Sequence, residues 1–154
     1  MVGTMLALLF QVGTERAAVD VRRVREVVPR VRLSSPPGGP PWLAGQFVYR
    51  GRVVPVIDLH AVAGADPCPP HLSSRIMLFE WPASGDTLVG LLATQVAEIR
   101  EVAAAAAGAG GGEASALGRA VPDGAGLLRI LDPDRLFAKL APHSSGLISP
   151  QGGV

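Results

Sequence analysis

The sequence predicts a mainly β protein with short helices and a single C-terminal helix. Runs of β-branched and aromatic residues recur along the chain and are separated by Gly- and Pro-rich turns. A complete helix-start signal occurs near the C-terminus, where Asp132 is placed to cap a helix that begins at Pro133. The chain of 154 residues fits one domain, and its 48% hydrophobic and 18% charged residues are typical of a globular protein.

The N-terminal region predicts a β-hairpin. Apolar residues alternate over residues 6–10, Gly13-Thr14 is a turn signal, and residues 17–21 form the returning strand. Residues 22–28 fit either a short helical turn or a third strand, because the run is too short to separate the two periods.

A second hairpin is predicted around Arg50-Gly51. Gly51 permits the tight reversal, and the flanking residues are of the types that strands favour: Phe47, Val48, Tyr49, Val53, Val54, Val56 and Ile57. Arg50 is therefore displayed at the tip of a rigid scaffold. Its aromatic neighbours Trp42, Phe47 and Tyr49 give the composition of a protein interface, although an arginine before a turn glycine can also be a solvated tip.

The remaining segments continue the β pattern. Loops are predicted at 34–41, 66–70 and 83–86, a short helical turn at 59–64, and strands at 76–81, 88–92, 95–102 and 127–131. The Ala/Gly stretch 103–112 is expected to be a flexible surface loop, and the helix runs to about residue 140 with Leu136, Phe137 and Leu140 buried. We expect a domain over residues 1–141 and a disordered tail over 142–154.

No enzymatic motif is present in the sequence. It contains no Gly-x-Ser-x-Gly elbow, phosphate-binding loop or dinucleotide fingerprint. Four potential zinc ligands, Asp58, His60, Cys68 and His71, fall in one window, but no two have the spacing that holds a metal on one element. We therefore expect exposed loop residues there, with no metal, no cofactor and no catalysis.

Charge and apolar runs limit the other classes. A net charge of +1 creates no global attraction to nucleic acid or to an anionic membrane. No apolar run approaches the roughly 20 residues of a membrane span, and residues 5–10 lack the basic segment of a signal peptide. The single cysteine cannot form an internal disulfide, so a cytoplasmic protein is expected.

A small β-barrel that binds single-stranded nucleic acid is the alternative function. It rests on a cluster of arginines in the first third of the chain: Arg16, Arg22, Arg23, Arg25, Arg30 and Arg32. The aromatic content of 5% leaves few platforms for stacking bases, and the arginines fit a protein-binding face better.

The ordered motifs resemble the family of CheW-like domains, the adaptors of bacterial chemosensory arrays. The central match is Trp42-x-x-Gly45 followed by Arg50-Gly51 and by Val-Val-Pro-Val-Ile-Asp-Leu at 53–59. Val-x-Glu-Val at 24–27, Val-Gly-Leu-Leu at 89–92, Val-x-Glu-Ile at 96–99 and Leu-Asp-x-x-x-Leu at 131–136 support it. Together they cover residues 4–140 in the family's order.

The resemblance implies a fold and a function. The fold would be two packed five-stranded SH3-like β-barrels, over about 12–66 and 72–131, with the N-terminal strand and the C-terminal helix between them. The protein would be a non-catalytic adaptor that couples a methyl-accepting chemoreceptor to a CheA-type histidine kinase. Its partners would be the cytoplasmic tip of the receptor and the regulatory domain of the kinase. It would join membrane receptor arrays through protein contacts, without inserting into the membrane.

The family's coupling surface maps by motif position onto Arg50, Gly45, Val24 and Glu26, with Tyr49 beside them. Arg50 would supply a charge-assisted contact, Glu26 a complementary charge, Val24 apolar area, and Gly45 room for close backbone approach. The chain departs from the family at Val48-Tyr49, where Asn-Leu is common. Phe47-x-Tyr49-Arg50-Gly51, with Leu-Ser-Ser-Arg at 72–75, looks closer to adaptors of Wsp-type surface-sensing systems, whose output is cyclic di-GMP.

Overall fold

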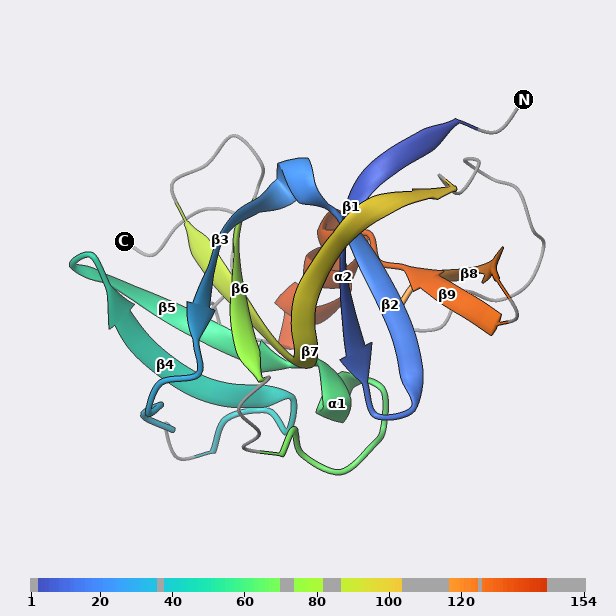
Figure 1. The fold of residues 1–154 in the computed structure, drawn as a ribbon. Helices are drawn as coiled ribbons and strands as arrows, with labels where there is room; N and C mark the ends of the chain where they lie inside the picture. Colours follow the sequence, from blue (N-terminus) through green and yellow to red (C-terminus); the bar gives the residue numbers. More distant parts are fainter. Residues whose placement is uncertain are drawn as a thin grey trace.

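The computed structural model describes residues 3–35, 38–69, 74–81, 87–103, 117–124 and 126–143. Over these residues the protein is mainly β, as predicted (Figure 1). The strands are β1 (Thr4–Val12), β2 (Glu15–Asp20), β3 (Val24–Pro29), β4 (Leu43–Tyr49), β5 (Arg52–Asp58), β6 (Arg75–Glu80), β7 (Leu88–Ala103), β8 (Arg119–Asp123) and β9 (Gly126–Ile130). The helices are α1 (Leu59–Val62), α2 (Pro133–Leu140) and two 3-10 turns, η1 (Val21–Arg23) and η2 (Ala141–His143).

The strands form two groups of five that share β7. One group contains β3, β6, β7, β5 and β4, and the other contains β7, β1, β2, β9 and β8. The groups lie on the left and the right of Figure 1. Strand pairing does not close either ring among the described residues, although a bridge between Ser34 and Gln46 joins the segment after β3 to β4. The boundaries expected for the two barrels, 12–66 and 72–131, divide the chain in sequence order. The observed strand pairing instead places the N-terminal strands β1 and β2 with β8 and β9.

A bend in β7 connects the two groups. The sequence predicts separate strands at 88–92 and 95–102, but the structure has one strand of 16 residues. Gln95 lies in the left-handed region with φ +53°, and the register with β1 shifts there, from Gln11 opposite Thr94 to Leu9 opposite Glu98. The Thr94 hydroxyl donates to the Gln11 carbonyl at 3.1 Å and fixes the bend.

Both alternatives for residues 22–28 occur in succession. Asp20 caps the turn η1 by accepting from the amide of Arg22 at 2.9 Å, and β3 follows from Val24. The strand β8 was not predicted. Its short sequence contains Pro122, which strands disfavour. The predicted turn at 83–86, the Ala/Gly loop beyond Ala103 and the tail beyond His143 lie outside the described residues, while Pro142 and His143 belong to η2.

The helix α2 packs against both groups of strands. Asp132 caps it as predicted, accepting from the amides of Asp134 and Arg135, and Leu136, Phe137 and Leu140 are buried in the largest core cluster. That cluster also contains Phe10 from β1 and Phe79 from β6. Truncation of a buried Phe typically costs about 3–5 kcal/mol, so this contact holds the two groups in a fixed relation. No helix of the described residues is long and apolar enough to cross a membrane.

Candidate partner-binding surface

The turn between β4 and β5 presents Arg50 at the end of a rigid hairpin. Tyr49 pairs with Arg52 across the turn, so Arg50 and Gly51 are its two central residues. Both have positive φ, +49° and +78°, as a type I′ turn requires. Gly51 adopts this conformation freely, but an arginine with a positive φ is strained. The side chain of Arg50 is 71% exposed, so burial does not explain the choice of arginine.

Three of the predicted site residues form one cluster beside this turn. The Tyr49 hydroxyl donates to Oε2 of Glu26 at 2.7 Å, and a guanidinium nitrogen of Arg50 lies 3.5 Å from Oε1. The guanidinium carbon of Arg50 lies 5.1 Å from the centroid of the Tyr49 ring. The hydrogen bond to Glu26 raises the pKa of Tyr49 above 10.0. The cluster fixes one carboxylate and one guanidinium, which can accept from and donate to a partner.

The two other predicted residues, Val24 and Gly45, make their contacts within the protein. Val24 is partly buried against the main core, where its register partner is Phe79. Gly45 is buried, and a Cβ there would lie 2.7 Å from Cβ of Leu33 and 2.8 Å from the carbonyl oxygen of Ser34. The close backbone approach that Gly45 allows is therefore to the protein's own segment after β3.

An apolar groove that sequence reasoning missed runs beside the hairpin. It has a volume of about 430 Å³ and is lined by Val31, Arg32, Ser34, Gln46, Phe47, Val48 and Val53. Val48 and Val53 pair directly across the hairpin and are 68% and 64% exposed. The described lining residues include an arginine but no acidic residue. The sequence shows a continuous apolar run at 53–57, and this run does not reveal which members face solvent.

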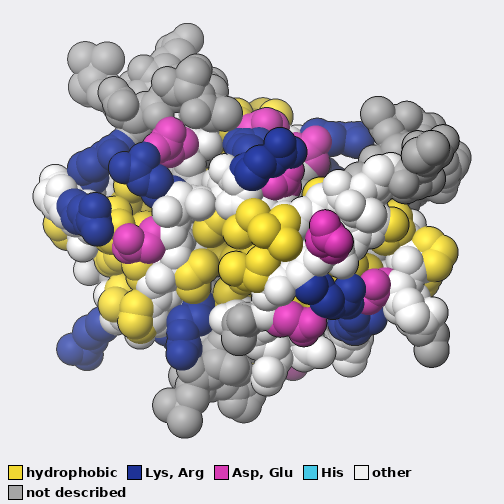
Figure 2. Space-filling view, turned by 45° about the horizontal axis from the view of Figure 1, so that its top comes forward, with side chains coloured by type: hydrophobic (Ala, Val, Ile, Leu, Met, Phe, Trp, Pro, Cys, Tyr) yellow, Lys and Arg dark blue, Asp and Glu magenta, His cyan; other side chains and the backbone are white. Residues whose placement is uncertain are grey.

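Basic residues gather around this end of the molecule. Figure 2 shows Lys and Arg side chains beside acidic ones at the left, the end that carries the β4–β5 turn in Figure 1.

Most of the arginine cluster predicted from the sequence has partners within the protein: Arg16 with Asp123, Arg22 with Asp20, Arg23 with Asp134, Arg25 with Glu80, and Arg30 with two carbonyl groups.

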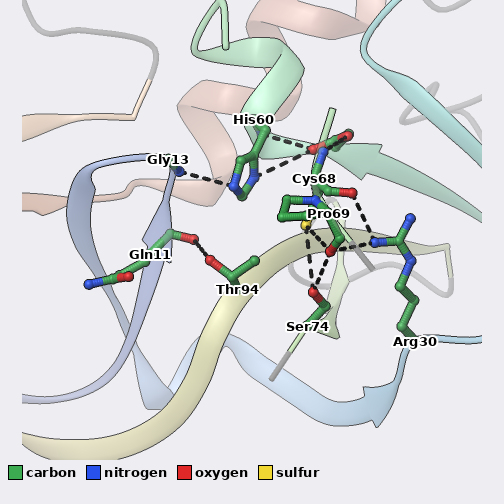
Figure 3. A network of polar contacts seen from close by, with 9 residues as sticks. Gln11, Gly13, Arg30, His60, Cys68, Pro69, Ser74 and Thr94 are labelled. Atoms are coloured by element: carbon green, nitrogen blue, oxygen red, sulfur yellow. Dashed lines mark hydrogen bonds and ion pairs between the residues drawn. The ribbon is translucent and has the colours of Figure 1, made fainter. Parts of the chain in front are cut away.

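The potential metal ligands are not exposed loop residues, and that expectation is wrong. Asp58, His60 and Cys68 are only 6%, 4% and 3% exposed. Asp58 ends β5 and accepts from the amides of His60 and Cys68, both at 2.9 Å, which turns the chain inward over the core (Figure 3). His71 lies outside the described residues.

Comparison with known proteins places these features in a family context. The model of the family CheW, described as the CheW-like domain, matches residues 6–141. A Rhizobium etli protein named "Probable chemotaxis protein CheW" is 30% identical over 95 residues, which are 62% of this chain and 59% of that protein. The chain thus spans less than two thirds of that relative.

A solved structure has the same fold. The scaffolding protein TtCheW from Thermoanaerobacter tengcongensis matches with a TM-score of 0.72 and 22% identity, over 88% of each chain. This likeness supports the assigned fold over most of the chain.

Proposed function

This chain belongs to the family of CheW-like domains, and from that premise we propose that it is a non-catalytic chemosensory adaptor. It couples a methyl-accepting chemoreceptor to a CheA-type histidine kinase by binding the receptor's cytoplasmic tip and the kinase's regulatory domain. The observation that carries the proposal is the cluster of Glu26, Tyr49 and Arg50 at a strained, exposed turn. Local backbone strain at an exposed residue is typical of a functional site.

The groove beside the hairpin supplies a second contact of different chemistry. Its exposed valines suit an apolar side chain of a partner, while Arg32 at its edge suits a carboxylate. Because β4 and β5 carry both the groove and the turn of Arg50, a partner that touches both is fixed in orientation. Oriented binding is what an adaptor without chemistry of its own contributes to kinase control.

A further apolar surface lies on the other group of strands. Leu6 on β1 and Ile99 on β7 are exposed large hydrophobic residues. Leu6 pairs with Glu101 and Leu8 pairs with Ile99, so the two exposed side chains are diagonal neighbours on one face. Two separate surfaces on a body whose halves share one core suit a protein that holds two partners at once.

The internal ion pairs weigh against the nucleic-acid alternative. Four of the six clustered arginines form ion pairs with carboxylates of the protein, which partly neutralise their charge, and Arg30 donates to backbone carbonyl groups. A nucleic-acid binder would also show affinity that falls steeply as salt is raised. Titration of labelled single-stranded oligonucleotides at two salt concentrations separates the two functions.

The direct test is titration calorimetry against the regulatory domain of the CheA-type kinase of the same organism and against a receptor tip fragment. We expect saturable binding that Arg50→Glu weakens by at least about tenfold, the effect typical of an interface hot spot. Arg135→Glu is the matched control, because Arg135 is also an exposed arginine but lies on α2. Absence of binding to both partners would refute the proposed function.

The adaptor would act in the cytoplasm and join receptor arrays through these protein contacts. The Wsp-type resemblance of the turn sequence stays a prediction. It would be tested by which receptor tip, from a motility or a surface-sensing cluster, competes for the protein.

A further inference from the structure

The outer edge of β4 is open beside the groove. β4 pairs with β5 alone, so its other side is an edge of the group of strands on the left of Figure 1. In a hairpin with a two-residue turn, the residues that flank the turn, here Tyr49 and Arg52, form a hydrogen-bonded pair. The next pair, Val48 and Val53, is therefore not hydrogen-bonded. As a result, the N–H and C=O groups of Val48 point away from β5.

The backbone of Gln46, two residues earlier on β4, confirms this alternation. Its N–H donates to the Ser34 carbonyl at 2.8 Å, and its carbonyl accepts from the Ser34 N–H at 2.9 Å, so it also faces outward. Continued antiparallel pairing would bring Arg32 opposite Val48, but the bridge at Ser34 is isolated. Arg32 and Val48 both line the groove, which therefore lies where this segment separates from β4. Among the described residues, no strand pairs with the outward groups of Val48.

The edge of β4 lacks the features that protect the other edge strands. β3 and β8, at the two ends of the main strand order, contain Pro29 and Pro122, whose nitrogens cannot donate to an added strand. The sequence of β4, Leu-Ala-Gly-Gln-Phe-Val-Tyr, has neither a proline nor a charged residue. An open edge of this kind is a template for another extended chain.

The groove has the chemistry to select one kind of chain. Val48 and Val53 lie opposite each other and expose apolar surface on one face of the hairpin. Phe47 and Val54 pack in a core cluster, which fixes the hairpin. Arg32 is exposed and, unlike the other five arginines of its cluster, forms no hydrogen bond or ion pair with the described residues. Because the described lining has no acidic residue, a carboxylate of a partner would complement this charge.

We propose that the edge of β4 at Val48 binds an extended segment of a partner protein by strand addition. The N–H and C=O groups of Val48 both pair with the backbone of this segment, and an apolar residue of the segment packs on the valines. A neighbouring acidic residue of the segment pairs with Arg32. The bridge at Ser34 ends the open edge, so the added strand is short. This inference rests on the proposed adaptor function and specifies how one of the two partners is held.

Proline substitution tests the backbone contact while preserving the hairpin. Val48→Pro removes an N–H that β5 does not use, and Val53→Pro removes the corresponding N–H on the opposite edge. Val48→Thr keeps the N–H and the β-branched shape. The probes are the kinase regulatory domain and the receptor tip fragment, each titrated by calorimetry. For the partner held at this edge, we expect Val48→Pro to weaken binding by at least about tenfold and the other two variants by about threefold or less.

Amide hydrogen exchange of the wild type gives a second readout that requires no variant. In the free protein, the Val48 amide should exchange fast, whereas the amides of Phe47 and Tyr49, which pair with β5, should be protected. Addition of the partner should slow exchange at Val48 by at least about tenfold and leave Val53 unchanged. If Val48→Pro does not fold, this measurement decides.

The acidic residue of the segment is tested at Arg32. Arg32→Glu should weaken the same binding by at least about tenfold, and Arg135→Glu, on α2, should leave it unchanged. Equal losses in Val48→Pro and Val48→Thr, or a Val48 amide that still exchanges fast in the complexes, would overturn strand addition and leave the adaptor function standing. Absence of wild-type binding to both probes would refute the adaptor function and this inference together.

Discussion

The hydroxyl group of Tyr49 donates a 2.7 Å hydrogen bond to Oε2 of Glu26, and the other oxygen of that carboxylate faces the guanidinium of Arg50. Tyr49 comes from β4 and Glu26 from β3, which are not paired strands. The bond therefore joins the hairpin to a neighbouring strand through side chains. It orients the acidic and basic groups that we assign to partner binding.

This relationship predicts a raised pKa for Tyr49, which is measurable in isolation because the chain contains one tyrosine. Ionisation of the phenol would break the bond to Glu26 and place two negative charges together, so the pKa lies above 10.0. The hydrogen bond from Tyr49 to Glu26 stabilises the fold fully below pH 10, where the phenol is neutral in the folded and unfolded chains. This stabilisation is lost as the pH rises through the raised pKa. Tyrosinate absorbance during an alkaline titration gives the midpoint.

The matched variant for that titration is Glu26→Gln. The amide keeps an acceptor for the phenol but removes the negative charge, so the midpoint should fall toward the value of an unfolded control in denaturant. A wild-type midpoint equal to the denatured one would show that Tyr49 and Glu26 do not interact in solution.

Replacement of Arg50 by asparagine should separate binding from stability. Asparagine tolerates positive φ better than arginine and is favoured before glycine in a type I′ turn, so Arg50→Asn should keep or raise Tm, by up to a few degrees. The exposed ion pair with Glu26 is long, at 3.5 Å, and contributes little to stability. Binding to the kinase domain should nevertheless weaken. Thermal denaturation and calorimetry on the same sample test both statements, and a marked fall in Tm would instead indicate a structural role for Arg50.

Gly45 should behave in the opposite way. A Cβ at this position would overlap Leu33 and the Ser34 carbonyl, so Gly45→Ala should destabilise the fold by roughly 2 kcal/mol or more. Gly64→Ala is the control, because Gly64 also has positive φ but has open space around its missing Cβ. Urea denaturation should show the larger loss for Gly45→Ala. Equal losses would mean that backbone conformation, and not the contact with residues 33–34, requires glycine.

Local signals predicted most of the fold. The type I′ turn at Arg50-Gly51 and the capped helix at Asp132 depend on neighbouring residues, and both were found where the sequence placed them. The grouping of strands could not be obtained this way. β6 and the first part of β7 pair with the earlier strands β3 and β5, and β7 then bends at Gln95 to pair with β1; glutamine carries no signal for a positive φ.

The contacts among the candidate site residues were also predicted only in part. Motif position identified Arg50, Tyr49 and Glu26, which the structure brings together. It did not show that Gly45 serves an internal contact, because the partner segment after β3 is distant in sequence and has no regular pattern. The burial of His60 and Cys68 was also missed, since the surrounding prolines resemble an exposed loop and the amide bonds to Asp58 are tertiary contacts.

Asp123 should make stability depend on pH in the acidic range. Its carboxylate accepts from Arg100 on β7 and from Arg16 on β2, at 2.6 and 2.7 Å, which lowers its pKa from 3.8 to about 2. The contribution is present above pH 3.8 and is lost as the pH falls toward 2. Because solvent screens both arginines, Asp123→Asn should cost about 1 kcal/mol at neutral pH. Urea denaturation should show this difference shrinking as the pH falls from 4 to 2. A difference independent of pH would assign the loss to packing.

The bend at Gln95 offers a test of whether β7 requires the left-handed backbone conformation at this position. Its φ of +53° is strained for any residue with a Cβ and most for a β-branched one. Gln95→Gly should therefore keep or slightly raise the free energy of unfolding, whereas Gln95→Val should lower it by about 1–2 kcal/mol. Thr94 still donates to Gln11 in both variants, so the glycine variant keeps the bend and should bind the kinase domain as wild type does. If Gln95→Val is as stable as wild type, β7 does not need this conformation, and the two groups of strands are not held together by the bend.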